Sequence, residues 1–294
     1  MGCGMGLRDW VPPAVMTAVR RYQQWYPTYD AALAACGSED YEDGRIVDVV
    51  VEKTRRFRDR IASEGLKPEL NFSSACSLTM LYSAGPSRRL NVVDFGGAAG
   101  AHYFTIRALL PSEYQLRWVV VETPAMAAGG AKHLANDELS FTAKLQEAEA
   151  KLGHIDLLHS SGTLQCLPDP IEQLRSMMLL PADHILLGRL ALTTGDRPLY
   201  GIHGSCLSEH GPGVMPEGFA NDFRFRIPIV YAPETRLRSV MAEHYRVASR
   251  FEDSSGISHA DPSVVGYGLL LKSLAATSGQ RESSHAGRQT VLAG

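Results

Sequence analysis

A short segment that joins an apolar run to a cluster of small residues is the part of the sequence best suited to bind a ligand. The run covers residues 90–95 and contains one acid, Asp94, and the cluster that follows is Gly96-Gly97-Ala98-Ala99-Gly100. Glycine lacks a Cβ atom, so the backbone can turn sharply there and approach a ligand closely. The pattern predicts a strand, a binding turn and the start of a helix. The residues expected to hold the ligand are Asp94, Gly96, Gly97, Ala98 and Gly100.

A second acid narrows the class of ligand. The apolar residues 118–121 end at Glu122, about 20 residues beyond the loop, where nucleoside sites of this layout place an acid that accepts hydrogen bonds from the ribose. An acid ahead of the first glycine suits a cationic ligand with an amino group and a sulfonium, so we expect S-adenosylmethionine as the cofactor. The simpler alternative is a buried strand that ends in a solvated glutamate. A P-loop is excluded, because no Gly-Lys-Ser or Gly-Lys-Thr follows the loop.

Polar side chains at the end of a later strand are candidates for the reacting centre. Ser161, Gly162 and Thr163 follow such a strand and are expected to contact the cofactor. Gln165 can donate and accept hydrogen bonds at once, so it can orient an acceptor or the cofactor, unless it only caps the next helix. His102 titrates near neutrality and is a candidate general base for a hydroxyl or an amine, unless it faces solvent.

Other reactive residue types are expected to be structural. Cys166 has no histidine beside it in the sequence to favour a thiolate, and His159 lies among the apolar residues of a strand. His203, Cys206 and His210 match no standard zinc spacing. We therefore predict no metal site.

The composition limits the class of partner. The chain has 294 residues, 45% of them hydrophobic, and a net charge of −3, and no more than two Lys or Arg residues follow one another. A nucleic-acid footprint or a membrane-binding patch is therefore not favoured, and a small-molecule substrate is. The five cysteines are scattered and odd in number, which is typical of a reducing compartment. We expect a cytoplasmic protein, since the first residues contain no long apolar run.

Several elements must position these residues. Apolar runs predict strands at 90–95, 117–122, 139–143, 154–160 and 184–190, with helical stretches such as 103–110 between them. This alternation predicts an α/β fold with a mostly parallel sheet, in which ligands bind at the carboxyl ends of the strands.

The flanking segments differ in character from this alternating region. Residues 14–26 and 41–61 carry the apolar spacing of helices, which either cap the ligand pocket or pack at the edge of the sheet. Residues 195–218 are rich in Gly and Pro and predict a long loop. We expect a helical region over 1–85, a cofactor-binding domain over 86–274 and a disordered tail over 275–294.

The motifs together resemble a bacterial family within the class I S-adenosylmethionine-dependent methyltransferases, which occurs in polysaccharide and natural-product gene clusters and includes azetidine-2-carboxylic acid synthases. The resemblance runs from about residue 29 to residue 272. Matching positions are Asp94 to Gly100, Tyr103-Phe104, Arg107, Trp118 to Glu122, Gly130, Asn136, Leu139, Phe141, Ser161 to Leu167, Asp169-Pro170 and, upstream, Arg58-Asp59. The sequence departs from the family at Cys166, where the family has Tyr, and at Gly188-Arg189, where it has Asp-Arg.

The resemblance implies a Rossmann-like class I methyltransferase fold with an N-terminal helical cap, and an enzyme of natural-product or saccharide biosynthesis. A methyltransferase is the first expectation. The family also implies a second reaction, in which the cofactor cyclises to azetidine-2-carboxylic acid and releases methylthioadenosine. Tyr103 is a catalytic candidate there, because its ring, with those of Phe104 and Trp118, can shield a sulfonium. Loss of the family residues at 166 and 188 motivates a third reading, a nucleoside-binding relic without activity.

Overall fold

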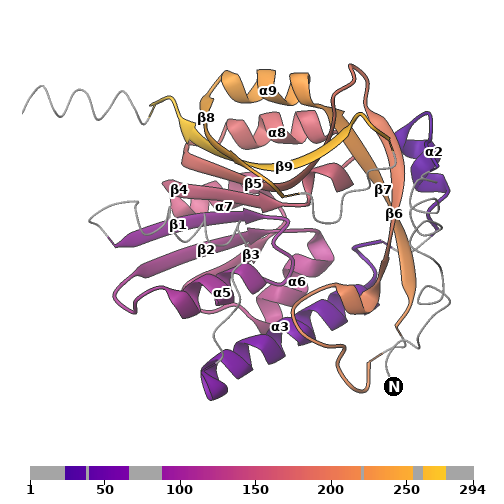
Figure 1. Cartoon of the computed structure of the whole chain (residues 1–294). Coiled ribbons are helices and arrows are strands. Elements are labelled where there is room, and N and C mark those ends of the chain that lie inside the picture. The colour runs from indigo at the N-terminus through magenta and orange to yellow at the C-terminus, as the bar shows by residue number, and fades with distance from the viewer. Residues whose placement is uncertain (1–23, 38–39, 66–87, 220–221, 254–260, 276–294) are drawn as a thin grey trace, which may run out of the picture.

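A parallel β-sheet forms the centre of the molecule (Figure 1). The computed structural model describes residues 24–37, 40–65, 88–219, 222–253 and 261–275. Five strands run parallel in the order β3-β2-β1-β4-β5, which is that of a Rossmann-like α/β fold. They are β1 (Arg89–Phe95), β2 (Gln115–Val121), β3 (Leu139–Thr142), β4 (Ile155–Ser161) and β5 (Ala182–Thr193). The predicted fold class and the five predicted strands are confirmed.

The sheet continues beyond β5 with strands that run in both directions. These are β6 (Leu199–Cys206), β7 (Arg224–Pro233), β8 (Tyr245–Phe251) and β9 (Val264–Ser273). β9 is antiparallel to both β5 and β8, whereas β7 is antiparallel to β6 and touches β5 only at the end of the strand. The predicted loop over 195–218 is therefore wrong in part, since residues 199–206 form a full strand of a hairpin.

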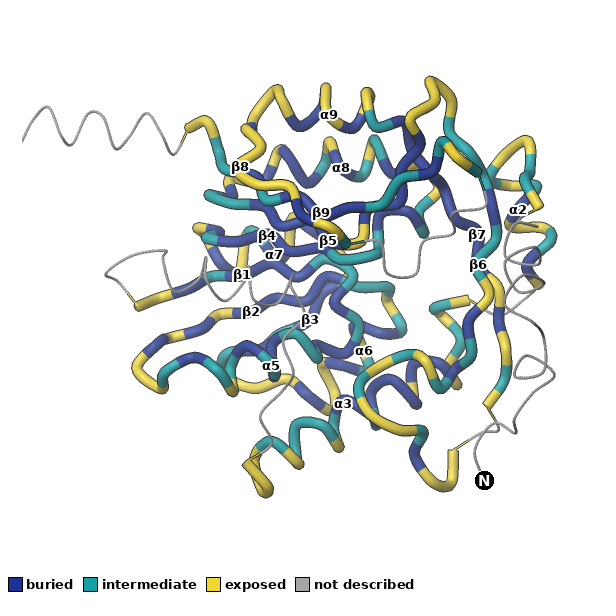
Figure 2. Tube along the Cα trace, viewed as in Figure 1, coloured by how far each residue is buried: buried dark blue, intermediate teal, exposed yellow. Residues whose placement is uncertain are grey.

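Helices cover both faces of the sheet (Figure 1). They are α2 (Tyr29–Ala34), α3 (Gly44–Glu64), α5 (Ala101–Leu109), α6 (Pro124–His133), α7 (Leu145–Leu152), α8 (Pro170–Met178) and α9 (Glu234–Ala242), with short 3-10 helices η2 (Leu164–Cys166) and η3 (Leu207–Glu209). Successive strand residues point to opposite faces, so Val92 packs with α3, α5 and α6, while Val93 packs with α7, α8 and α9. Buried residues accordingly follow the strands through the centre of the molecule (Figure 2).

The N-terminal helices are placed on two different parts of the fold. α3 starts at its N-cap Asp43, ends at Gly65 in the left-handed conformation and buries one apolar face beside α6. α3 is thus the helix predicted over 41–61, and it packs against α6 and α5 in the helix layer that covers one face of the sheet. α2 packs against the hairpin of β6 and β7. The predicted helix over 14–26 and the predicted tail lie almost wholly outside the described residues.

No helix in the described part of the chain combines the length and the apolar character that crossing a bilayer requires.

Candidate functional site

Three parallel strands bring the predicted site residues together at their carboxyl ends. Ala98, in the loop after β1, donates its backbone N–H to Glu122 at the end of β2. On the other side of β1, Thr163, after β4, lies against Gly96 of the same loop. We call the edge formed by these three strand ends and the end of β5 the cleft edge.

The loop after β1 is held by contacts within the protein itself. Gly96, Ala98 and Gly100 have φ angles of 73°, 49° and 81°, in the left-handed region that favours glycine. A Cβ atom on Gly96 would lie 2.0 Å from the Thr163 hydroxyl oxygen, and one on Gly97 would lie 2.4 Å from the Asp94 carboxylate. The glycines are therefore required by the packing of this loop against Thr163 and Asp94, and not only by the approach of a ligand.

Gly96→Ala is expected to lower the free energy of unfolding by about 2–4 kcal/mol, because overpacking costs about 1–3 kcal/mol and a left-handed residue adds about 1 kcal/mol. Thr163→Gly removes the side chain that the new Cβ meets. In urea unfolding, the double variant should be more stable than the sum of the two single effects predicts. Additive effects would show that Thr163 does not restrict position 96.

Glu122 is held at the cleft edge by two backbone groups. Its Oε1 accepts from Ala98 N at 3.0 Å and its Oε2 from Thr123 N at 2.8 Å. Burial raises the pKa of Glu122, while these two hydrogen bonds act to lower it. A carboxylate accepts about four hydrogen bonds, so one site on each oxygen is left for hydroxyl groups of a ligand.

Asp94 is the centre of a buried hydrogen-bonded cluster. Its side chain is fully buried, and its Oδ1 accepts from His159 Nδ1 at 2.9 Å. Its Oδ2 accepts from His102 Nδ1 at 3.2 Å and from Trp118 Nε1 at 3.3 Å. Both ring Nδ1 atoms must be the donors, because an ionised carboxylate only accepts. Asp94, which was expected to contact the cofactor, therefore directs both oxygens to groups of the protein, and within this cluster the His102 side chain is 34% exposed.

The three titratable groups of this cluster influence one another's pKa values. Burial acts to raise the pKa of Asp94, but the charges and hydrogen bonds of His102 and His159 hold it well below its ordinary value. Burial acts to lower the pKa of His102, but Asp94 raises it overall. Burial lowers the pKa of His159 despite its contact with Asp94. Asp94 is thus ionised, His102 is the more basic histidine and His159 is neutral.

The same three side chains offer one ligand atom each within 4.8 Å of one another, a combination of residue types that metal sites use, but both histidine Nδ1 atoms donate to Asp94 in this arrangement. Among the described residues, the groups with this property do not include His203, Cys206 or His210. His210 instead forms a hydrogen bond within the protein, since its Nε2 lies 2.9 Å from the Ser205 hydroxyl oxygen.

The catalytic candidates Gln165 and Tyr103, and Cys166, which was expected to be structural, lie in three different environments. Gln165 is almost buried in η2, and its Nε2 donates to the backbone oxygen of Arg189 at 3.1 Å, so the amide positions a neighbouring segment. Burial raises the pKa of the Cys166 thiol to about 12, which fits a packing residue. Tyr103 is buried, and its hydroxyl donates to Glu138 before β3, away from the cleft edge. Tyr103 therefore does not suit a catalytic role.

The rings proposed to shield a sulfonium are also part of the core. Phe104 is 7% exposed and Trp118 is 1% exposed, and both pack edge-on against Tyr103. They offer no open face to a ligand.

Two residues that the sequence did not single out as site residues lie at the cleft edge. Arg189, on β5, donates from its side chain to Ser161 at the end of β4. Tyr41, just before α3, packs edge-on against His210 and Phe225 of the hairpin region. Burial first, then the nearby Cys166 and Glu122, raise the pKa of Tyr41. For Arg189 the available signal was its match to the Asp-Arg pair of the resembling family, whereas nothing in the sequence pointed to Tyr41.

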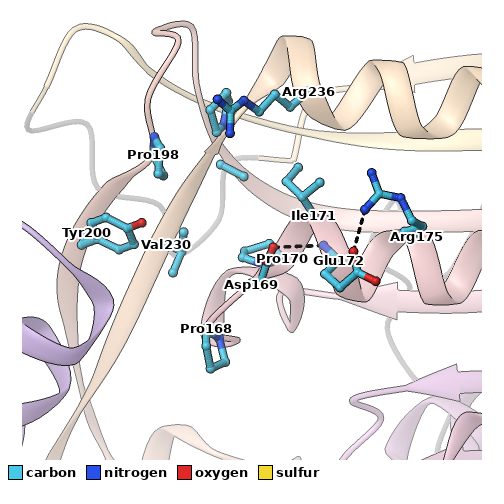
Figure 3. Close-up of a pocket in the computed structure, with 12 residues that line it drawn as sticks. Pro168, Asp169, Pro170, Ile171, Glu172, Arg175, Pro198, Tyr200, Val230 and Arg236 are labelled. Atoms are coloured by element: carbon cyan, nitrogen blue, oxygen red, sulfur yellow. Dashed lines mark hydrogen bonds and ion pairs between the residues drawn. The ribbon is translucent and has the colours of Figure 1, made fainter.

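A separate cavity of about 250 Å³ lies between the start of α8, the hairpin of β6 and β7, and α9. Figure 3 shows Tyr200 and Val230 on one side and the turn into α8 on the other. Its lining is Pro168, Asp169, Pro170, Ile171, Glu172, Arg175, Pro198, Tyr200, Val230, Ala232, Pro233 and Arg236, which includes none of the predicted site residues. In open α/β sheets, ligands bind at the carboxyl ends of the strands, so we take the cleft edge as the candidate site.

No protein-family model matches the chain, and no curated protein matches it. Among solved structures, an S-adenosylmethionine-dependent methyltransferase from Clostridium acetobutylicum ATCC 824 is 8% identical over 75% of this chain and 98% of its own, with a TM-score of 0.44. The magnesium protoporphyrin IX methyltransferase ChlM from Synechocystis PCC 6803, with S-adenosylmethionine bound, is 12% identical over 75% and 96%, with a TM-score of 0.39. The N-terminal domain of EvdMO1 with S-adenosylhomocysteine bound is 13% identical over 69% and 82%, with a TM-score of 0.42. At these values, the similarities do not assign the chain to a family.

Proposed function

We propose that the protein is an S-adenosylmethionine-dependent methyltransferase that acts on a small molecule. The observation that carries the proposal is the position of Glu122: a carboxylate fixed against the N–H of Ala98 in the glycine loop, with acceptor sites left on both oxygens. A ribose with two adjacent hydroxyl groups is the ligand that such a pair of acceptor sites fits. The left-handed loop before α5 leaves its backbone close to the same point.

In this proposal, some residues of the cleft edge bind the cofactor and His102 accepts the proton. The cofactor, when bound, supplies an electrophilic methyl group. Glu122 holds the ribose, while the loop from Gly96 to Gly100 and residues 161–163 approach the methionine portion. His102 takes a proton from the acceptor at Nε2, since Asp94 fixes its Nδ1 and raises its basicity. Asp94 thus acts as a positioning residue for His102.

The proposal is tested by binding and by product analysis. Calorimetry with S-adenosylhomocysteine is expected to show binding to the purified protein. Incubation with S-adenosylmethionine and small acceptors that carry hydroxyl or amino groups is expected to release S-adenosylhomocysteine. Because the neutral form of His102 is the base, turnover should rise with pH through the raised pKa of His102 and should lose this step in His102→Gln.

Each alternative gives a different product. Methylthioadenosine formed without an acceptor would identify the cyclising reaction and overturn methyl transfer. Binding of S-adenosylhomocysteine with neither product, across the acceptors, would identify a relic. No binding at all would remove the nucleoside site from the cleft edge.

A further inference from the structure

Arg189 stands in an unusual backbone conformation within a central strand. Its φ angle is 50°, and the pairing of β5 with β9 shifts register between Leu187 and Leu190. Its backbone N–H donates to the Asp253 carboxylate at 3.0 Å. A left-handed residue other than glycine costs about 1–3 kcal/mol, and bulges of this kind redirect a side chain, often next to a functional site. The strand is therefore distorted at the residue whose side chain reaches the cleft edge.

Hydrogen bonds from one edge of the Arg189 guanidinium group to Ser161 fix its orientation. Nε donates to the Ser161 hydroxyl at 3.1 Å and Nη2 donates to the Ser161 backbone oxygen at 2.8 Å. The group lies over Gly162, where a Cβ atom would be 2.8 Å from Cζ. These contacts use the edge formed by Nε and Nη2. The other edge, formed by Nη1 and Nη2, keeps one N–H on each nitrogen for a ligand.

The charge of Arg189 is not neutralised by the described part of the protein. No carboxylate of a described residue forms an ion pair with this guanidinium, and the residue is exposed. Two histidines whose pKa values are lowered in part by the charge of Arg189 are neutral: burial is the main cause that lowers the pKa of His203 and brings that of His210 to about 4. His102 also lies within reach of this charge, but its raised pKa belongs to its pair with the Asp94 carboxylate. Arg189 is thus the permanent cation of this region.

The position of Arg189 separates it from the ribose end of the site. β5 lies beyond β4, and the glycine loop follows β1 on the far side of β4. Neighbouring strands are about 5 Å apart, so Arg189 lies roughly 10 Å from the loop along the sheet. Arg189 is therefore placed to meet an acceptor, or the methionine end of a nucleoside cofactor, and not the ribose at Glu122.

We propose that Arg189 binds a carboxylate group at the cleft edge. An arginine with its Nη1 and Nη2 edge open matches a carboxylate in a bidentate pair, and Ser161 fixes the orientation of that edge in advance. The carboxylate belongs either to the acceptor, which makes the substrate a small carboxylic acid, or to the methionine portion of the cofactor. The assignment of either source rests on the proposed function.

The experiment compares Arg189→Gln with the wild-type protein and with Arg246→Gln, a control on the exposed strand β8. Calorimetry measures the affinity of S-adenosylhomocysteine, which carries the methionine carboxylate, and of methylthioadenosine, which lacks it. Ligand-observed NMR measures the affinity of benzoate for the free and the S-adenosylhomocysteine-loaded protein. Arg189→Lys is the second variant, because it keeps the charge and loses the bidentate geometry. Thermal unfolding confirms that each variant is folded.

If the acceptor supplies the carboxylate, Arg189→Gln weakens benzoate binding at least tenfold and leaves both nucleosides unchanged. If the cofactor supplies the carboxylate, Arg189→Gln lowers the affinity for S-adenosylhomocysteine at least tenfold and leaves the affinity for methylthioadenosine unchanged. The affinity of Arg189→Lys for the carboxylate ligand should lie between that of the wild type and that of Arg189→Gln. Unchanged affinity for both carboxylates in folded Arg189→Gln overturns the proposal. If the wild type binds neither nucleoside, the proposed function fails, while the benzoate series on the free protein still tests Arg189.

Discussion

Asp94→Ala is expected to lower the free energy of unfolding by about 3 kcal/mol at about pH 6, the lower end of the cost of removing one partner of a buried ion pair. The carboxylate is fully buried and accepts from His102, His159 and Trp118, so three donors lose their acceptor at once. The lower end applies because one edge of His102 faces solvent. Urea unfolding measures the change, and Asp196→Ala, at an exposed position, is the control.

The pH dependence of this effect follows from the directions of the pKa shifts. The lowered pKa of Asp94 gives stability that is present above about pH 3.9 and is lost as the pH falls. The raised pKa of His102 gives stability that is full below about pH 6.5 and is lost as the pH rises through its folded pKa. The difference between wild type and Asp94→Ala should therefore be largest between about pH 4 and 6.5. A difference that stays constant from about pH 3 to 9 would contradict an ionised cluster.

The burial of His159 lowers the stability of the wild-type protein at acidic pH, in contrast to the effect of His102. Its lowered pKa means that the unfolded chain binds a proton below about pH 6.5 while the folded chain does not, so wild-type stability falls there. The comparison with Asp94→Ala must therefore be made at matched pH values.

Glu122→Ala is expected to make the binding free energy of S-adenosylhomocysteine less favourable by about 1.5–3 kcal/mol, since hydrogen bonds to a charged group contribute about that much. This corresponds to a loss of affinity of roughly 10- to 150-fold. The physical reason is the loss of both acceptor sites for the ribose, together with the acceptor that holds Ala98 N–H in the loop. Calorimetry measures the effect, and Glu113→Ala, before β2 at the opposite edge of the sheet, is the matched control.

A second ligand separates ribose recognition from loop collapse. Wild type should prefer methylthioadenosine over its 2′-deoxy analogue, and Glu122→Ala should lose this preference. If the variant binds more weakly but keeps the preference, Glu122 only supports the loop and the ribose lies elsewhere. Unchanged affinity in a folded variant would remove Glu122 from the site.

The strands were predictable because their apolar runs are long and end in Asp94 and Glu122, where parallel strands place ligand-binding groups. Strand β6 was missed, because Leu199–Cys206 contains two glycines and a histidine and shows little alternation. Its partner β7 begins only at Arg224, so the pairing that forms the hairpin, and its contact with α2, join segments that no local pattern connects.

The chemistry at Asp94 and Arg189 depends on contacts between distant parts of the chain. His159 lies far along the sequence from Asp94 and meets it only because β4 pairs with β1. The left-handed backbone at Arg189 arises from the pairing of β5 with β9, which no local pattern encodes. Tyr103 was misplaced for a simpler reason: it shares the buried face of α5 with Ile106, a spacing that already indicates the core.

The order in which the chain is synthesised affects when the two ends of the cleft can form. β1, β2 and β4, which carry the glycine loop, Glu122 and Ser161, belong to the first two thirds of the chain. The bulge that directs Arg189 forms where β5 pairs with Val264–Ser273, the most C-terminal strand among the described residues. A nascent chain therefore completes the proposed nucleoside end first and gains its oriented cation only after nearly all of the described chain has emerged.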